Sequence, residues 1–284
     1  MLQEPLFTIF GQEIYMYGVC IAVGILACFG VLYYYTKKKG MPTKVQDFIF
    51  FVAIVAIAFG FLAAKFYQAV YDWVANGYKN FDFYNAGITV MGGLIGGAAA
   101  FLGAYFGIGH FYFRGKDEKL HVKHFNTLFL VAPLCILVAH AFGRIGCLCA
   151  GCCHGADLGD TYVFGGIYMG DSYYVPTQLY EALFLFVLFA VLSVAYFKNW
   201  NIIMPLYLIG YGIWRLIIEF FRADYRGGFV LKLAPSQWQS FVFIGIGLAI
   251  LAFYYFRKIP FILKDNAEPI VESKTETENT DKKD

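Results

Sequence analysis

The chain has 284 residues, of which 60% are hydrophobic and only 15% are charged. Soluble domains are about 45–50% apolar and about 25% charged. The composition therefore excludes a soluble globular protein and indicates an integral membrane protein. The formal net charge of +2 is too small to indicate a nucleic-acid-binding protein, so we expect no nucleic-acid partner.

Seven segments are apolar over the roughly 20 residues that a helix needs to cross a bilayer. They lie near residues 14–36, 48–75, 88–109, 127–149, 178–198, 201–220 and 238–259. We predict an all-α integral membrane protein, with one seven-transmembrane-helix bundle over residues 1–263. Residues 264–284 are charged and contain no aromatic residue, which is typical of a disordered tail.

Lysine and arginine gather in alternate loops, and this asymmetry predicts orientation because cytoplasmic loops are rich in these residues. The basic loops follow the first, third, fifth and seventh segments, at Lys37, Lys38, Lys39, Lys44, Arg114, Lys116, Lys119, Lys123, Lys198, Arg257, Lys258 and Lys264. Residues 150–177 contain neither lysine nor arginine. We therefore predict an external N-terminus and a cytoplasmic C-terminus.

The loop over 221–237 departs from this alternation, since it is predicted to be external but is basic. It contains Arg222, Arg226 and Lys232. Two interpretations stay open. Either the charge pattern is an imperfect signal, or these cations meet an anionic lipid headgroup or a peptide at the outer surface.

Ionisable side chains within membrane helices are costly and usually face a cavity or one another. One stripe of polar residues, at spacings of four, four and three, comprises Tyr211, Arg215, Glu219 and Arg222. An internal salt bridge between Arg215 and Glu219 would explain it. The alternative is a polar wall whose guanidinium binds phosphate, a task that suits the charged, forked donors of arginine.

A second arginine, Arg144, ends the fourth predicted helix on the external side. If Arg144 and Arg215 face one cavity, they repel each other unless an anion, Glu181 or Glu219 lies between them. Two arginines and two glutamates near one membrane depth therefore indicate a phosphate-handling site.

Features of the second and third segments are interpreted first as packing. Lys65, Gln68 and Asp72 share a helix face, and a structural pair of Lys65 with Asp72 is the favoured interpretation. The glycine-rich run over 91–97 lets helices approach closely. Its residues Gly92 and Gly93 would also admit a lipid headgroup near the start of the helix.

Five potential metal ligands with soft or borderline donor atoms fall within eight residues: Cys147, Cys149, Cys152, Cys153 and His154. Thiolates and imidazole suit zinc or Cu(I), although no second group of ligands occurs elsewhere in the sequence. A disulfide or redox role and a packing or substrate-contact role are the alternatives. The other three cysteines lie in apolar segments and are interpreted as small apolar residues.

Motifs spread through the seven segments together resemble the bacterial prolipoprotein diacylglyceryl transferase family. They are Tyr-Met-Tyr-Gly at 15–18, Met-Gly-Gly-Leu-Ile-Gly at 91–96, Gly-Arg-Ile-Gly at 143–146 with Gly155, Pro-Thr-Gln-Leu-Tyr-Glu at 176–181, and Tyr-Gly-Ile-Trp-Arg at 211–215 with Glu-Phe-Phe-Arg at 219–222. Three positions depart from the family pattern. Met91 replaces a histidine, Cys147 an asparagine and Cys152 a glutamate.

The resemblance implies a reaction in which a lipoprotein-precursor cysteine takes diacylglyceryl from phosphatidylglycerol and releases glycerol phosphate. The implied catalytic residues are Arg144, Arg215, Tyr211, Glu181 and His154. The implied substrate-binding residues are Arg144, Tyr17, Gly92, Gly93, Gly155, Glu219 and Arg222. Because Met91 cannot accept a proton, His154 or a cysteine thiolate is left as the base.

The resemblance also implies the surroundings of the protein. The expected partners are phosphatidylglycerol, membrane lipids and lipoprotein precursors, and the expected location is the bacterial plasma (inner) membrane. No cofactor is expected. A different class of function stays open: a related bundle repurposed for thiol redox chemistry or metal binding through Cys147, Cys149, Cys152, Cys153 and His154. An inactive lipid- or partner-binding homologue is a third possibility.

Overall fold

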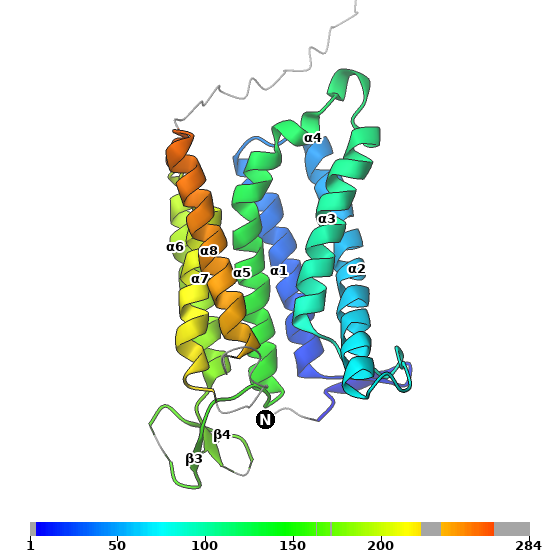
Figure 1. Cartoon of the computed structure of the whole chain (residues 1–284), viewed down its shortest axis with the longest axis vertical. Helices are drawn as coiled ribbons and strands as arrows, with labels where there is room; N and C mark the ends of the chain where they lie inside the picture. Colours follow the sequence, from blue (N-terminus) through cyan, green and yellow to red (C-terminus); the bar gives the residue numbers. More distant parts are fainter. Residues whose placement is uncertain (1–3, 163, 171, 223–233, 264–284) are drawn as a thin grey trace, which may run out of the picture.

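The computed structural model describes residues 4–162, 164–170, 172–222 and 234–263. Its elements are β1 (Phe7–Ile9), β2 (Gln12–Ile14), α1 (Met16–Lys38), α2 (Thr43–Ala75), α3 (Val90–Tyr112), a 3-10 turn (Gly115–Asp117), α4 (Leu120–Lys123), α5 (Phe125–Cys149), β3 (Asp157–Gly159), β4 (Ile167–Tyr168), β5 (Tyr173–Tyr174), α6 (Thr177–Phe197), α7 (Ile203–Glu219) and α8 (Pro235–Phe256). The long helices stand side by side, with the strands at one end and α4 at the other (Figure 1). Arg226, Lys232 and the predicted tail lie outside the described residues.

The helical membrane class is confirmed. Within the described residues, six helices are long and apolar enough to cross a membrane: Met16–Lys38, Thr43–Val74, Gly92–Tyr112, Phe125–Cys149, Thr177–Phe197 and Ser236–Phe256. The remaining predicted span corresponds to α7, which has 17 residues. At about 1.5 Å per residue it is ~26 Å long, somewhat shorter than the ~30 Å hydrocarbon core of a bilayer.

The helix boundaries agree with the prediction to within a few residues, and α2 differs most. It begins at Thr43, directly after Pro42, rather than at residue 48. Its first turns contain Lys44, Gln46 and Asp47. A prediction from hydropathy starts the span only where the apolar residues begin, whereas the helix also includes these polar turns.

Helix α5 is the centre of the bundle. It packs between α1 and α6 and also contacts α7, while α2 packs on α3 and α7 on α8. Four apolar side chains along α5 are fully buried, namely Val131, Leu134, Leu137 and Ala141. The central position of α5 brings the polar groups near its end against α6 and α7.

Short strands form two small sheets at one end of the bundle. β1 and β2 form an antiparallel hairpin before α1, and β3, β5 and β4 form a three-stranded antiparallel sheet between α5 and α6. These strands are not among the predicted elements. Strands of two or three residues are too short to show an alternating apolar pattern, and glycines with positive φ, such as Gly159 (85°) and Gly170 (105°), interrupt the segment.

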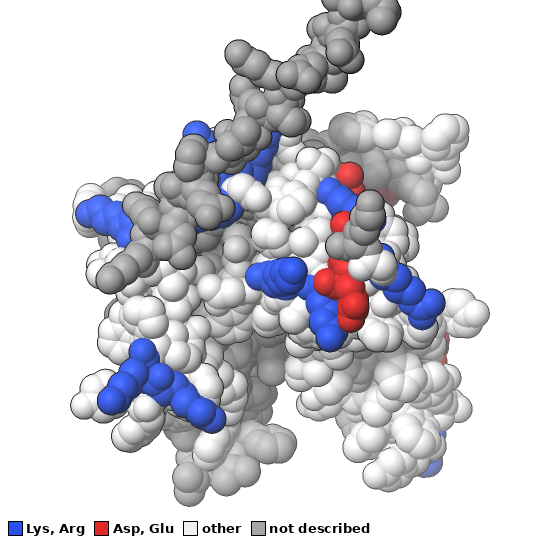
Figure 2. Space-filling view, turned by 90° about the horizontal axis from the view of Figure 1, so that it is seen from above, with Lys and Arg blue, Asp and Glu red and all other residues white. Residues whose placement is uncertain are grey.

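The opposite end of the molecule is basic. Viewed from that end, lysine and arginine side chains are spread over the surface (Figure 2). This end contains the turns after α1 and α3, α4, and the start of the segment after α8, where the sequence places most of its cations. Most of the basic loops that the sequence analysis selected therefore gather at this end of the bundle.

The predicted pairing of Lys65 with Asp72 is wrong. The side chain of Gln68, one turn before Asp72, donates a 2.8 Å hydrogen bond to its carboxylate instead. Lys65 lies over the ring of Phe83, with its Nζ 5.6 Å from the ring centroid. Lys65 and Asp72 share a helix face but are two turns apart, so the nearer amide takes the carboxylate.

Glycines of α3 make its contact with α2. A Cβ added at Gly96 would lie 2.2 Å from the Cβ of Ala63, and one at Gly92 would lie 2.6 Å from the Cβ of Tyr67. Such separations require the helices to move apart. The glycine run is therefore a helix-packing seam, as its first interpretation predicts.

We expect Gly96→Ala to destabilise the protein by about 1–3 kcal/mol, because the added methyl overpacks the seam. Gly103→Ala is the matched control on the same helix, since a Cβ there meets no atom within 4 Å. The thermal unfolding midpoint in detergent measures both variants. Equal midpoints for the two would show that the seam tolerates a methyl group.

Candidate functional site

Polar groups from three helices converge at the end of the bundle that carries the strands. There α5 ends, α6 begins and α7 ends (Figure 1). Glu181, one turn into α6, is at the centre, and its side chain is only 1% exposed. The Nε of Arg144 is 2.9 Å from its Oε2, and Nη1 of Arg215 is 3.6 Å from the same oxygen. The two arginines therefore share one buried carboxylate.

Two further side chains of α7 complete these contacts. The hydroxyl of Tyr211 donates a 3.0 Å hydrogen bond to Oε1 of Glu181. Arg215 also pairs with Glu219, with Nη2 3.2 Å from Oε2. The internal salt bridge between Arg215 and Glu219 is therefore present, and it belongs to a larger cluster that includes Arg144. We call Arg144, Glu181, Tyr211, Arg215 and Glu219 the ionic cluster.

The structure adds one residue that the sequence analysis did not select, His140. Its Nε2 is 3.7 Å from Oε1 of Glu181, and its ring lies 5.3 Å from that of Tyr211. The sequence contained a signal for it, because His140 and Arg144 are four residues apart on one helix and so share a face.

His154 lies apart from the ionic cluster. Its Nδ1 is 3.1 Å from the carbonyl oxygen of Gly155, and its ring packs 4.2 Å from the ring of Tyr174. These contacts place His154 against the β5 strand. The structure therefore gives no support for His154 as the base of the site.

Gly155 joins the loop after α5 to the ends of α6 and α7. Its N–H donates a 2.8 Å hydrogen bond to the carbonyl of Val175, and its backbone pairs with that of Arg222. A Cβ at this position would lie 2.3 Å from the carbonyl oxygen of Phe221. The absence of a side chain thus allows three segments to meet, and it places Arg222 at the same end as the cluster.

Tyr17 lies at the start of α1, against the last turns of α5. A Cβ added at Gly146 would lie 3.0 Å from the Tyr17 ring and 3.2 Å from Cβ of Cys20. Gly146 therefore allows α1 to approach the segment of α5 that carries Arg144. Gly92 and Gly93 do not join this group, because both contact α2. These contacts are helix packing against α2.

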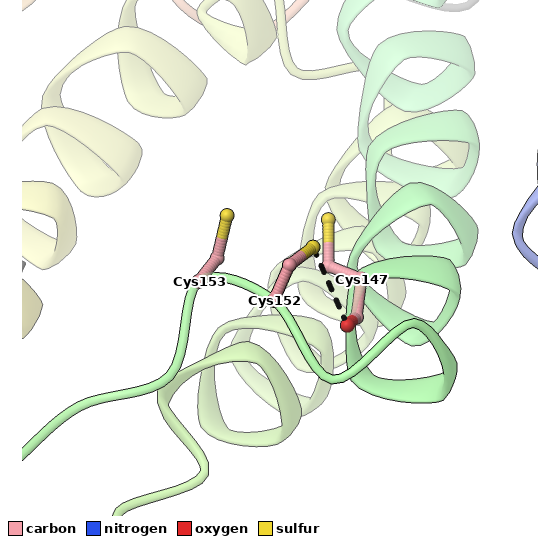
Figure 3. A group of neighbouring side chains, drawn as sticks. All are labelled: Cys147, Cys152 and Cys153. Carbon is pink, nitrogen blue, oxygen red and sulfur yellow. Dashed lines mark hydrogen bonds between the residues drawn. The ribbon is translucent and has the colours of Figure 1, made fainter. Parts of the chain in front are cut away.

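The five candidate metal ligands separate into three groups. The sulfur atoms of Cys147, Cys152 and Cys153 lie within 4.8 Å of one another and on the same side of the loop that follows α5 (Figure 3). Cys149 is not part of this group, since its thiol interacts with that of Cys20 on α1. His154 packs on Tyr174, as described. We call Cys147, Cys152 and Cys153 the thiol triad.

The thiol triad is held next to the ionic cluster. Gln178 donates a 2.5 Å hydrogen bond to the carbonyl of Cys152, and Thr177 donates a 2.9 Å bond to that of Cys153. Both donors precede Glu181 on the first turn of α6. Partial burial, followed by the effect of neighbouring Cys153, raises the pKa of the Cys152 thiol.

Known proteins resemble this chain over most of its length. The family described as prolipoprotein diacylglyceryl transferase matches residues 4–253. A phosphatidylglycerol–prolipoprotein diacylglyceryl transferase of Clostridium tetani is 34% identical over 272 residues, which are 90% of this chain and 100% of that protein. A protein of the same name, numbered 2, from Clostridium perfringens is 33% identical over 256 residues, covering 86% and 91%. One from Streptococcus pneumoniae is 30% identical over 263 residues, covering 88% and 93%.

The family match includes every helix that contributes to the ionic cluster and the thiol triad. The motifs at 143–146, 176–181 and 211–222 supply Arg144, Glu181 and Arg215, which meet in the structure. The chain belongs to the prolipoprotein diacylglyceryl transferase family.

Proposed function

We propose that this chain is a membrane enzyme that transfers the diacylglyceryl group of phosphatidylglycerol to a cysteine thiol of a lipoprotein precursor. The relatives named above support the substrates. The observation that carries the proposal within this chain is the convergence of Arg144 and Arg215 on Glu181, at one end of the bundle.

In this proposal the phosphate of the lipid binds at Arg144. That side chain contacts Glu181 through Nε, on one edge of its guanidinium, and it retains 15% exposure. Its terminal nitrogens form the edge that would face an incoming phosphate. Arginine donors beside the phosphate stabilise the negative charge that develops as glycerol phosphate leaves, and this lowers the barrier.

The other members of the cluster orient Arg144. Glu181 fixes the guanidinium, Tyr211 fixes Glu181, and Arg215 balances the charge of both glutamates. Arg215 is only 7% exposed, so its contribution to an external headgroup is electrostatic. Arg222, Tyr17 and Gly155 lie around this end and are proposed to contact the lipid or shape its entry.

We also propose the finer membrane arrangement, with seven spans, an external N-terminus and a cytoplasmic C-terminus in the bacterial plasma membrane. The basic character of the end that carries α4 supports it, since cytoplasmic loops are enriched in lysine and arginine. This orientation places the ionic cluster near the outer leaflet. The helices over 1–263 then form one domain, and 264–284 a cytoplasmic extension.

Complementation tests the proposed function. Cells depleted of their own diacylglyceryl transferase would express this chain together with a reporter lipoprotein, and mass spectrometry would follow the reporter. We expect a diacylglyceryl group on the reporter cysteine and no such mass on a reporter with serine in its place. A well-expressed chain that leaves the cysteine reporter unmodified would contradict the proposal.

A further inference from the structure

The proposed function assigns no group to deprotonate the acceptor thiol. Glu181 is 1% exposed and is already contacted by Arg144, Arg215, Tyr211 and His140. His140 faces that same carboxylate. An incoming thiol must nevertheless lose its proton, because the thiolate is the attacking species.

The thiol triad has the composition and spacing of a metal site. All three sulfurs lie within 4.8 Å of one another. Zinc–thiolate bonds of about 2.3 Å in tetrahedral geometry place ligand sulfurs about 3.8 Å apart. Small side-chain movements, of about 1 Å at most, would therefore bring the three sulfurs to coordination distance.

The backbone around the triad favours this convergence. Cys153 has a φ of 65°, in the left-handed region that side chains other than glycine seldom adopt. The hydrogen bonds from Thr177 and Gln178 hold the carbonyls of Cys153 and Cys152. Both donors are buried, each with 1% exposure. The loop is thus fixed with the sulfurs of Cys152 and Cys153 on the same side as that of Cys147, which lies on α5 (Figure 3).

We infer that the thiol triad binds a zinc ion through three thiolates and leaves the fourth coordination position to the thiol of the acceptor. Among the described residues, the triad includes no fourth side-chain ligand, because Cys149 turns to Cys20 and His154 to Tyr174. Three protein ligands with one open position are the pattern of a catalytic zinc site. The assignment of the acceptor thiol as the fourth ligand rests on the proposed function.

The position of the site suits the reaction. Cys147 is three residues beyond Arg144 on α5, so the two side chains lie one turn apart on neighbouring faces. A thiol that binds zinc is deprotonated, and its proton passes to water. Its sulfur lone pair then forms the bond to the glyceryl carbon. The carbon–oxygen bond to phosphate breaks, and its electron pair leaves with the glycerol phosphate at Arg144.

Metal analysis of the full chain, purified in detergent with its thiols reduced, tests the site directly. We expect about one zinc per chain, and substitution with Co²⁺ should give the near-ultraviolet charge-transfer band of cobalt thiolates. Cys152→Ser should weaken binding by more than about tenfold, since losing even a hydrogen-bond partner of a ligand costs that much. Cys147→Ser should do the same, while Cys149→Ser is the matched control.

Cys152 is the exposed member of the triad, so its serine variant is the least disruptive to folding, and gel filtration verifies its fold. A reduced wild-type protein that binds no zinc, or a Cys152→Ser variant that binds it equally, would overturn the site. For the open position, a lipobox peptide with cysteine should alter the cobalt spectrum, and a serine peptide should not. A spectrum that the cysteine peptide leaves unchanged would overturn the role of the acceptor thiol as fourth ligand.

The same protein separates this inference from the proposed function. Zinc binding without lipid transfer would support the zinc site and contradict the proposed function. Lipid transfer by a protein shown to be free of zinc would support the proposed function and contradict the catalytic zinc site.

Discussion

Arg144→Ala should reduce diacylglyceryl transfer to a lipobox peptide by at least about 10²-fold, the scale seen when a donor to a developing negative charge is removed. Alanine supplies neither charge nor donors at the position where we place the phosphate. Arg144→Lys should retain part of the activity, because lysine keeps the charge but not the forked donors. Transfer from phosphatidylglycerol in membranes, with equal amounts of each variant, measures the effect.

Arg257→Ala serves as the control for this measurement. Arg257 follows α8 at the basic end of the bundle, and its guanidinium lies 5.8 Å from the ring centroid of Phe253. Its removal takes away one arginine far from the site, so transfer should be unchanged. Normal transfer by Arg144→Ala would exclude Arg144 from the mechanism and with it the proposed phosphate site.

Glu181→Gln should lower both stability and transfer, because this buried carboxylate is shared by two arginines. Glutamine has the same shape but no charge, and it leaves Arg144 and Arg215 as neighbouring cations. Removing one partner of a buried ion pair costs about 3–5 kcal/mol. We therefore expect a clearly lower unfolding midpoint in detergent, with transfer falling at temperatures where the variant remains folded.

Glu118→Gln is the matched control for that change. Glu118 lies near the basic end, 3.5 Å from Lys119, with its side chain 67% exposed. Exposed pairs contribute only about 0–1 kcal/mol, so this variant should unfold like the wild type. If both variants unfold at the same temperature, Glu181 does not hold the cluster together.

Much of the fold could be predicted because membrane helices are specified by simple chemistry. Long apolar runs set the helices, and the family motifs identified Arg144, Glu181 and Arg215 before any contact was known. The small sheets could not be predicted, because strands of two or three residues carry no periodic signal. The start of α2 was misplaced because helix geometry extends into polar turns that hydropathy ignores.

The site shows the same division between residue type and geometry. The stripe on α7 left two interpretations open, a salt bridge between Arg215 and Glu219 or a phosphate-binding wall, and the salt bridge is present. Which carboxylate lies between the arginines depends on how α5, α6 and α7 pack, and helical spacing within one segment does not contain that information. The cysteine run likewise gave five candidate ligands, and only the path of the loop reduced them to three.

The order of these residues along the chain has a consequence for biosynthesis. Arg144 is translated before Glu181, and Glu181 before Arg215. Helix α5 therefore enters the bilayer while its arginine still has no carboxylate, and an arginine at the centre of a membrane helix costs about 2.5–3.5 kcal/mol on insertion scales, less near a helix end such as this one. An 18-residue window within Phe125–Cys149 has a mean hydropathy of 2.0, and this apolar stretch offsets that burden until α6 arrives. Apolar residues of α5, far from the site, thus favour membrane insertion of the helix before Arg144 can pair with Glu181.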